Sequence, residues 1–375
     1  MKNLPLSRPT WIEIDLDAVE HNVHTARNLV AKNVKLYGVC KADAMGCGLT
    51  TIGQTFAEAG IDGLAVSDPA DVVKLREADV KTPILLFAST LPEQAADVAA
   101  LDAIPVIHDF ESLEAFARLQ RPLEIFCKID SGMGRLGFTE EPWTRAVSQL
   151  AAAPQLKLKG LYTHMSKPDD REVTANQADR FERACNVATS HGFAPFEQMA
   201  ASSRVLLGYP EYHYSAADPG RLLLGMLDSP WAEMAPTRPV IRALKSRVIQ
   251  VQEHAAGTQL GIGYGKPINS RSLIRTAVIP IGFSDGLNHA PPLGEVIICG
   301  KRAPVLGRRS IEFSLLDVTG ISGVEVGSEV VLLGEQENER ITTIELAKTL
   351  NLPTLELLPR IAHNTTRVYI RNYLS

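Results

Sequence analysis

From about residue 10 to residue 230 the chain alternates short apolar runs with longer amphipathic segments, and no other feature constrains its fold as strongly. Each apolar run has the length of a buried strand, and a segment of helical character follows most of them. The predicted strands include Lys35–Cys40, Gly63–Val66, Pro83–Phe87, Ile104–Ile107, Leu123–Ile129 and Leu156–Tyr162, and the predicted helices include Thr51–Ala59, Phe110–Leu119 and Ala175–Ser190. Repeated strand–helix units at this spacing predict a parallel sheet, and this many units predict a closed (β/α)8 TIM barrel.

The pattern changes after about residue 240, where runs rich in β-branched residues are separated by Gly, Pro and Asn turns. The predicted strands there are Arg242–Gln252, Ser272–Ile281, Glu295–Ile298, Ala303–Leu306 and Glu329–Leu333, with one helix at Ile344–Leu350. A chain of 375 residues also exceeds what one hydrophobic core usually fills. We therefore expect an α/β protein with a barrel domain over residues 10–235 and a β-rich domain over residues 240–375, with which residues 1–9 pack.

Composition and charge exclude several classes of function. The formal net charge of -5, without any Lys/Arg cluster, argues against a nucleic-acid-binding surface. The five cysteines show no C-x-x-C spacing, so we expect neither a disulfide framework nor a zinc site. The first residues lack the apolar stretch of a signal peptide, and no apolar run is long enough to cross a membrane. These features predict a cytoplasmic protein.

Several charged residues follow predicted strands, where the active site of a barrel lies. Lys41 comes directly after the first of these strands, and small residues follow it in the sequence, so its amine is placed to form a Schiff base. An ordinary solvated lysine would fit the same position. The stretch Lys128–Arg135 puts two cations and a carboxylate at the end of another strand, and a capping turn with solvated charges is its alternative.

Three further segments have a structural explanation as well as a functional one. Ser202-Ser203 and Asp218–Arg221 are candidates for an anion site built from backbone amides, and both also fit plain turns. Tyr264 lies between two glycines, a setting more typical of loop packing than of a catalytic acid. Each signal is modest alone, and their order along the chain makes them specific.

That order resembles the alanine racemase family of fold type III pyridoxal-phosphate enzymes. The segment VCKADAMGCG (residues 39–48) is similar to the family's cofactor-lysine motif V-x-K-A-D/N-A-Y-G-H-G, and KIDSGMGRLGF (residues 128–138) is almost unaltered. The segments GLYTHMSKPD, AASSRVLL, PGRLLLG, GIGYG, IPIGFSDG and LGRRSIEF follow in the family's order, so the resemblance covers nearly the whole chain. It implies a pyridoxal 5'-phosphate barrel and a β domain in a homodimer, in which the partner subunit completes each active site.

The resemblance also implies roles for individual residues. Lys41 would hold the cofactor and act as one catalytic base, and Tyr264 of the partner subunit would be the base on the opposite face of Cα. Arg135 would make the Tyr264 phenolate accessible and meet substrate or cofactor oxygen atoms. Lys128 matches a lysine that is often carbamylated in relatives, and His164 matches a histidine packed against the pyridine ring.

The phosphate-binding and substrate positions follow the family less closely. Ser203 and the backbone at Gly220 and Arg221 match the phosphate cradle, but Met45 and Leu355 replace two tyrosines whose hydroxyls serve the phosphate and its surroundings. The Arg221 side chain is a candidate substitute, because relatives usually have an aliphatic residue there. On the substrate side and at the entrance, Phe283 replaces a tyrosine and Ile311-Glu312 replaces Met-Asp.

The departure with the largest chemical consequence concerns the cofactor ring. Alignment on Pro219-Gly220 puts Asp218 where the family has an arginine facing the pyridine nitrogen. A carboxylate there would keep that nitrogen protonated and strengthen the electron sink. If the register slips by three residues, Arg221 takes this position instead.

Three hypotheses follow. The first is an amino-acid racemase with an altered or broad substrate range, because two opposed bases serve little purpose in one-sided chemistry. The second is a pyridoxal-phosphate lyase for aldol-type cleavage, elimination or decarboxylation, which Asp218 and the changed substrate side favour. The third is a cofactor-binding relative with little catalysis, which the lost phosphate tyrosines suggest.

Overall fold

The computed structural model of the chain describes residues 7–260, 268–269, 272–291 and 294–371, and it divides into two compact units. One unit comprises residues 18–44 and 49–238, and we call it the barrel unit. The other comprises residues 1–17, 45–48 and 239–375, and we call it the β unit. No helix within the described ranges is both long enough and apolar enough to span a bilayer.

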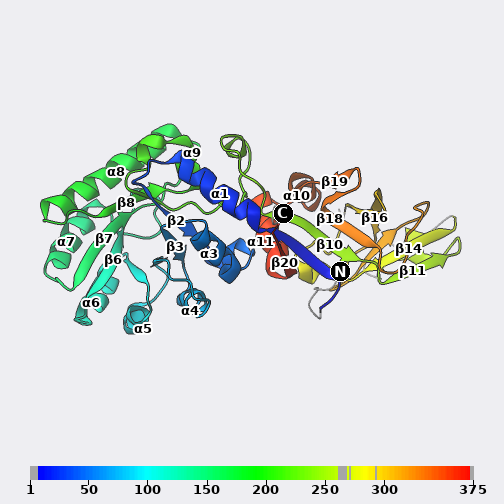
Figure 1. Cartoon of the computed structure of the whole chain (residues 1–375), viewed down its shortest axis with the longest axis horizontal. Coiled ribbons are helices and arrows are strands. Elements are labelled where there is room, and N and C mark those ends of the chain that lie inside the picture. Colours follow the sequence, from blue (N-terminus) through cyan, green and yellow to red (C-terminus); the bar gives the residue numbers. More distant parts are fainter. Residues whose placement is uncertain (1–6, 261–267, 270–271, 292–293, 372–375) are drawn as a thin grey trace. The chain divides into compact units, whose positions relative to one another are not determined.

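The barrel unit confirms the predicted TIM barrel. Parallel pairing joins its eight strands in sequence order, and the last strand pairs with the first (Figure 1). The strands are β2 (Lys35–Val39), β3 (Gly63–Val66), β4 (Ile84–Leu86), β5 (Ile104–Ile107), β6 (Leu123–Lys128), β7 (Leu156–Tyr162), β8 (Glu197–Ala201) and β9 (Ala216–Ala217). Buried side chains such as Val39, Leu85, Val106, Phe126 and Met199 form one core cluster, so this barrel is packed with side chains.

Helices lie on the outside of the barrel (Figure 1). They are α1 (Leu16–Leu29), which precedes β2, and α3 (Leu49–Glu58), α4 (Pro69–Glu77), α5 (Ala95–Ala100), α6 (Phe110–Arg118), α7 (Glu140–Ala151), α8 (Arg171–Ser190) and α9 (Ser203–Gly208), each of which follows a strand. The segment α2 (Lys41–Met45), directly after β2, is a left-handed turn. Local sequence fixes several of their ends. The carboxylates of Asp68, Asp109 and Asp170 accept backbone N–H groups in the first turns of α4, α6 and α8.

The β unit has one large mixed sheet in the order β11-β14-β17-β16-β15-β18-β10-β1-β20. Its strands are β1 (Thr10–Asp15), β10 (Ile241–Arg247), β11 (Gln250–His254), β14 (Ile274–Ile279), β15 (Glu295–Ile298), β16 (Lys301–Leu306), β17 (Ser314–Asp317), β18 (Glu329–Gln336) and β20 (Thr366–Ile370). The short strand β19 (Glu339–Ile341) pairs with β18, and β12 (Gln259–Leu260) pairs with β13 (Ile268–Asn269). Two helices, α10 (Thr343–Leu350) and α11 (Thr354–His363), complete the unit.

The β unit differs from the expectation in two places. The barrel domain was expected to start at residue 10, but β1 pairs with β10 and β20 and so belongs to this sheet. Helix α11 was not predicted, because Pro359 lies inside it and proline normally ends a helix.

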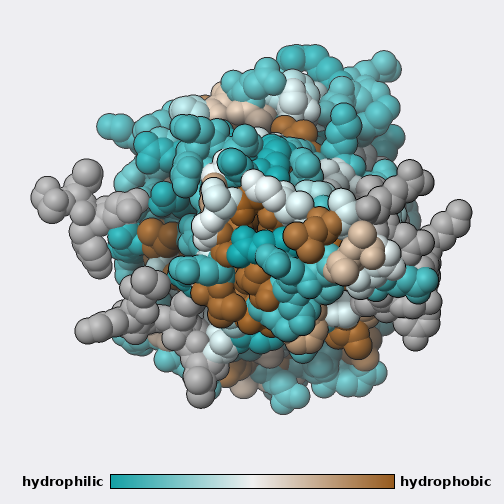
Figure 2. All heavy atoms as spheres, turned by 90° about the vertical axis from the view of Figure 1, so that its right-hand side faces the viewer, coloured by the Kyte–Doolittle hydropathy of each residue, from teal (hydrophilic) through white to brown (hydrophobic). Residues whose placement is uncertain are grey.

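Figure 2, which looks onto the right-hand side of Figure 1, shows hydrophobic residues gathered near the middle of an otherwise largely hydrophilic face.

Candidate active site

The predicted site residues of the barrel unit lie at or just beyond the carboxyl ends of its strands. Lys41 follows β2, Lys128 is the last residue of β6, His164 follows β7, Ser203 follows β8 and Asp218 follows β9. Because all strands of the barrel run parallel, these ends meet at one mouth. The fold therefore gathers at one end of the barrel residues that are up to 177 positions apart in sequence, the separation of Lys41 and Asp218 (218 minus 41).

Lys41 opens a left-handed turn. Ala42, Asp43 and Ala44 have φ angles between 52° and 56°, and the Ala44 N–H donates to the Cys40 carbonyl at 2.8 Å. The Asp43 carboxylate then accepts the Leu49 N–H at 2.7 Å. Left-handed backbone costs roughly 1–2 kcal/mol for each residue with a Cβ atom. The surrounding structure thus holds a strained backbone directly after the predicted cofactor lysine.

Two aromatic rings lie against the two lysines. The Lys128 Nζ atom is 3.8 Å from the centre of the Tyr162 ring, and the Lys41 Nζ atom is 5.8 Å from the centre of the Phe87 ring. The two rings pack on each other with their centres 5.4 Å apart. Phe87 and Tyr162 did not emerge as candidates from the sequence, although an aromatic residue at the end of a barrel strand could have drawn attention to both.

Burial and mutual charge shift the pKa values of Lys128, Asp218 and His164. Burial lowers the pKa of Lys128, against the attraction of Asp218. Burial raises the pKa of the Asp218 carboxyl, against the attraction of Lys128 and then Lys41. Burial, reinforced by Lys128, Lys41 and Arg135, lowers the pKa of His164 to about 3. His164 is therefore a neutral imidazole at pH 7.

The Asp218 carboxylate has one buried oxygen, Oδ1, without a hydrogen-bond partner in the described part of the chain. The residue is 6% exposed, so little water reaches it. An unpaired buried acceptor is costly, and its free energy falls when a bound molecule supplies a donor. Asp218 thus marks a place where a ligand N–H group fits.

Arg135 lies in the loop between β6 and α7, and this loop is tightly held. Asp130 Oδ1 accepts the N–H groups of Gly132, Met133 and Gly134 at 2.9, 2.8 and 3.1 Å. Gly137 has a φ of +113°, and a Cβ atom on it would lie 2.8 Å from the Lys128 carbonyl oxygen. Only glycine fits there, so the loop that carries Arg135 has a defined path beside Lys128.

Ser203 organises the loop after β9. Its Oγ atom accepts the N–H of Gly220 at 3.0 Å and the N–H of Leu222 at 3.1 Å. The Arg221 side chain between them donates to the Met226 carbonyl at 3.1 Å and forms an ion pair with Asp228. Of the two residues considered for the position at the cofactor ring, Asp218 is therefore the one in the charge cluster with Lys41.

The remaining predicted residues belong to the β unit. Ile311 and Glu312 lie in the loop between β16 and β17, and Ile311 is 60% exposed. Phe283 is next to them, since the Phe283 N–H donates to the carbonyl of Ser310 at 3.1 Å. Leu355 lies in α11, and Tyr264 lies outside the described residues.

Comparison with known proteins agrees with this architecture. A family model described as the alanine racemase N-terminal domain matches residues 14–228, and one described as the alanine racemase C-terminal domain matches residues 241–369. The chain is 30% identical to the alanine racemase of Halothermothrix orenii, over 98% of each chain.

Solved structures agree as well. The alanine racemase of Clostridium difficile 630 superposes with a TM-score of 0.89 at 27% identity, covering 98% of this chain and 97% of that one. The alanine racemase of Bacillus anthracis with bound L-Ala-P gives the same TM-score and coverage at 26% identity. With both domains matched and the fold shared along its length, the chain belongs to the alanine racemase family.

Proposed function

We propose that this chain is a pyridoxal-phosphate-dependent amino-acid racemase that acts on alanine or on a related or broader set of amino acids. The observation that carries the proposal is the arrangement of Lys41, Lys128 and Asp218 at one barrel mouth, where burial and mutual charge couple the latter two. The relatives named alanine racemases support an amino acid as the substrate.

The residues present fit the cofactor. Asp218 Oδ1, which has no partner within the described ranges, could accept a hydrogen bond from a protonated pyridine nitrogen, and the neutral His164 suits packing against an aromatic ring. The Ser203 hydroxyl, whose oxygen accepts the N–H groups of Gly220 and Leu222, can donate its proton to a phosphate oxygen. When bound, pyridoxal phosphate withdraws electrons from the substrate Cα and so acidifies its C–H bond.

Racemisation needs a proton to leave one face of Cα and return from the other. The Lys41 amine holds the cofactor and carries the proton on one face. Tyr264 of the partner subunit carries it on the opposite face, which makes the active enzyme a homodimer with shared sites. Arg135 supplies positive charge that favours the tyrosine phenolate and meets oxygen atoms of the substrate.

Lys128 takes part through its charge. As an ammonium group it balances Asp218, and as a carbamate it would instead provide an anion that supports Arg135. Its lowered pKa increases the fraction of free amine, the form that reacts with carbon dioxide. Ile311 and Glu312 contribute to the substrate side of the site.

A lyase on the same scaffold is the second candidate, and Asp218 is the observation that favours it. A carboxylate at the pyridine nitrogen strengthens electron withdrawal from Cα. A longer-lived negative charge at that carbon also suits aldol-type cleavage, elimination or decarboxylation.

One experiment separates these functions. The purified protein, loaded with pyridoxal phosphate, is incubated with a panel of amino acids in deuterated water. Racemisation puts deuterium at Cα of both enantiomers, whereas a lyase releases an aldehyde, a keto acid or carbon dioxide without mixing them. Borohydride reduction should fix a pyridoxyl group on Lys41. Absence of that adduct would exclude the entire proposal.

A further inference from the structure

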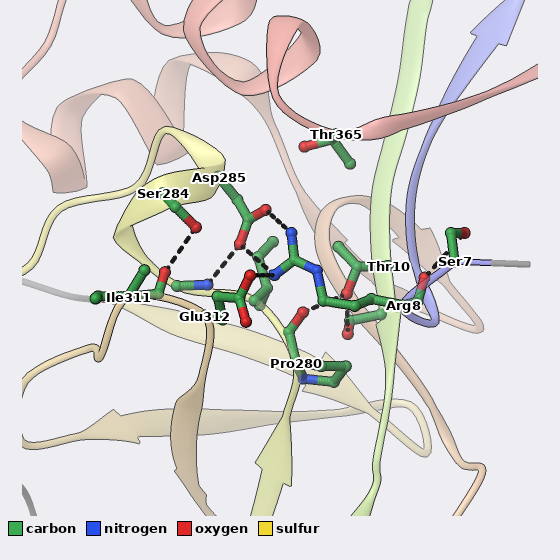
Figure 3. A network of polar contacts seen from close by, with 12 residues as sticks. Ser7, Arg8, Thr10, Pro280, Ser284, Asp285, Ile311, Glu312 and Thr365 are labelled. Atoms are coloured by element: carbon green, nitrogen blue, oxygen red, sulfur yellow. Dashed lines mark hydrogen bonds and ion pairs between the residues drawn. The ribbon is translucent and has the colours of Figure 1, made fainter.

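An ion pair between the buried Asp285 and the half-buried Arg8 joins two segments of the β unit that are far apart in sequence (Figure 3). Arg8, just before β1, donates to Asp285 in the short turn η4 (Phe283–Asp285) through both terminal nitrogens, at 2.7 and 3.3 Å. The Asp285 side chain is 1% exposed and the Arg8 side chain 37% exposed. Because the planar guanidinium meets both carboxylate oxygens, the pair fixes orientation as well as distance.

Arg8 is itself held firmly at its backbone. The Thr10 N–H donates to the Arg8 carbonyl at 2.7 Å, and the buried Thr10 hydroxyl donates to the Pro280 carbonyl at 2.8 Å (Figure 3). Thr10 also bonds to the Ser246 hydroxyl at 2.8 Å. The start of β1 is thus tied to the segment that leads into η4, so the Arg8 side chain extends from a fixed base.

Asp285 also stabilises the turn η4 in which it lies. Its Oδ2 atom accepts the Gly282 N–H at 2.8 Å. Gly282 packs directly on the segment of residues 310–312, because a Cβ atom at Gly282 would lie 2.2 Å from the Ile311 carbonyl oxygen and 2.4 Å from that of Ser310. The turn and the segment therefore touch backbone to backbone, without side chains to absorb a shift.

Hydrogen bonds make the same connection. The Phe283 N–H donates to the Ser310 carbonyl at 3.1 Å, and Ser284 donates to the Ile311 carbonyl through its N–H at 3.0 Å and its hydroxyl at 2.8 Å. Arg8 also approaches the segment directly, since its Nη1 atom lies 3.8 Å from Glu312 Oε1. Arg8 thus reaches residues 310–312 by two routes.

We propose that Arg8 is a positioning residue that acts through Asp285 to hold residues 310–312 in one conformation, and that this sets the affinity for the amino-acid substrate. The inference rests on the proposed function, which puts Ile311 and Glu312 on the substrate side. Ile311 is 60% exposed, so packing of its side chain does little to hold the residue in place. The hydrogen bonds from Ser284 to the Ile311 carbonyl therefore hold Ile311 in place.

The test compares Arg8→Gln and Arg8→Lys with Arg340→Gln in the cofactor-loaded enzyme. Arg340 is a matched control in the same unit, because it is exposed and pairs with Glu335 at the surface. In Arg8→Gln we expect the KM for the substrate to rise about 10-fold, with kcat changed less than about 3-fold, because a misplaced binding segment weakens uniform binding. Lysine keeps the positive charge but cannot make the bidentate contact of a guanidinium group, so the KM of Arg8→Lys should lie between those of the wild type and Arg8→Gln.

Amide hydrogen exchange supplies a readout that is independent of activity. The N–H groups of Phe283 and Ser284 should exchange about 10-fold faster in Arg8→Gln, while those of β18 keep their wild-type rates. Equal acceleration throughout the β unit would reduce Arg8 to a general stabilising residue and overturn the inference. A wild-type KM in Arg8→Gln, in an enzyme that does racemise, would overturn it too. If the wild-type protein neither racemises nor fixes pyridoxyl on Lys41, the proposed function fails and takes this inference with it.

Discussion

The Lys128 Nζ atom lies 3.8 Å from the centre of the Tyr162 ring, and both residues are buried at the carboxyl ends of neighbouring strands. A cation over an aromatic ring gains most when both are withdrawn from water. This contact offsets part of the cost of burying the ammonium group. The ring is therefore a structural support for the charge of Lys128.

A double-mutant cycle measures that support. Tyr162→Leu combined with Lys128→Met should give a coupling free energy of about 1–2 kcal/mol in chemical unfolding of the cofactor-free protein. Tyr162→Phe keeps the ring and should keep most of the coupling. Lys157→Met is the control, since Lys157 is exposed on the same strand, β7. Coupling with Lys128 no larger than with Lys157 would rule out the cation–π contribution.

The loop that carries Arg135 should respond differently to alanine at its two neighbouring glycines. Gly134 and Gly137 both have positive φ angles, but a Cβ atom meets nothing within 4 Å at Gly134, whereas at Gly137 it meets backbone atoms at 2.8 Å. Gly137→Ala should therefore destabilise the protein by roughly 1–3 kcal/mol more than Gly134→Ala. It should also weaken binding of pyridoxal phosphate, measured by absorbance titration. Equal effects of the two substitutions would show that the loop is not held against Lys128.

The left-handed turn after Lys41 makes a further prediction. A β-branched residue tolerates left-handed backbone poorly, so Ala42→Val should cost at least about 1 kcal/mol more than Ala96→Val in thermal or urea unfolding. Both alanines are exposed, and Ala96 lies in the right-handed helix α5. Ala42→Gly should be neutral or slightly stabilising, because relief of strain offsets the greater freedom of the unfolded chain. A harmless Ala42→Val would contradict the left-handed conformation.

Much of the fold could be predicted because the barrel strands are continuous apolar runs. Gly63–Val66 and Ile104–Ile107 have the predicted ends, since both strands are fully buried and a polar residue follows each of them, Ser67 and His108. Thr10–Asp15 could not be assigned in this way. The alternation of residues in this strand suits any sheet. It belongs to the β unit because it pairs with residues 241–246 and 366–370, far along the chain.

The positions of the candidate site residues could be predicted from residue type and strand order, but the contacts around them could not. Lys41 and Lys128 stood out as charged residues at the ends of apolar strands, whereas Asp218 was identified by alignment on Pro219-Gly220. The structure places each of them at the carboxyl end of a barrel strand. The support from Phe87 and Tyr162 was missed, because aromatic residues at strand ends are common in cores. The Arg8–Asp285 pair was missed because no spacing rule links residues 277 positions apart.

The pH dependence of stability should carry the signature of His164. Its pKa is about 3 in the folded chain against 6.5 when unperturbed, so between these values the unfolded state binds more protons. Stability therefore falls as the pH drops through this window, by up to about 1.4 kcal/mol per pH unit for one group. His164→Gln removes this titration, so the stability of the wild type relative to that variant, measured in urea unfolding, should be constant above about pH 6.5 and should fall as the pH drops below it. Parallel stability curves for both proteins between pH 4 and about 6.5 would contradict a buried neutral imidazole.

Asp218 makes the prediction that bears most directly on the chemistry. Its buried Oδ1 atom has no hydrogen-bond partner among the residues that the structure describes, and its charge raises the pKa of Lys128 against the effect of burial. Asp218→Asn keeps the shape but removes the charge, so the Lys128 pKa should fall further, measured from the ¹³C shift of its ε carbon. The same substitution should weaken pyridoxal phosphate binding roughly 10- to 100-fold, because a hydrogen bond to a charged group becomes a neutral one. Asp102→Asn is the control, since the Asp102 carboxylate is largely exposed and pairs with Arg76 at the surface of the same unit. If Asp218→Asn binds the cofactor as the wild type does while the Lys128 pKa falls, the carboxylate serves Lys128 alone and has no role at the pyridine nitrogen.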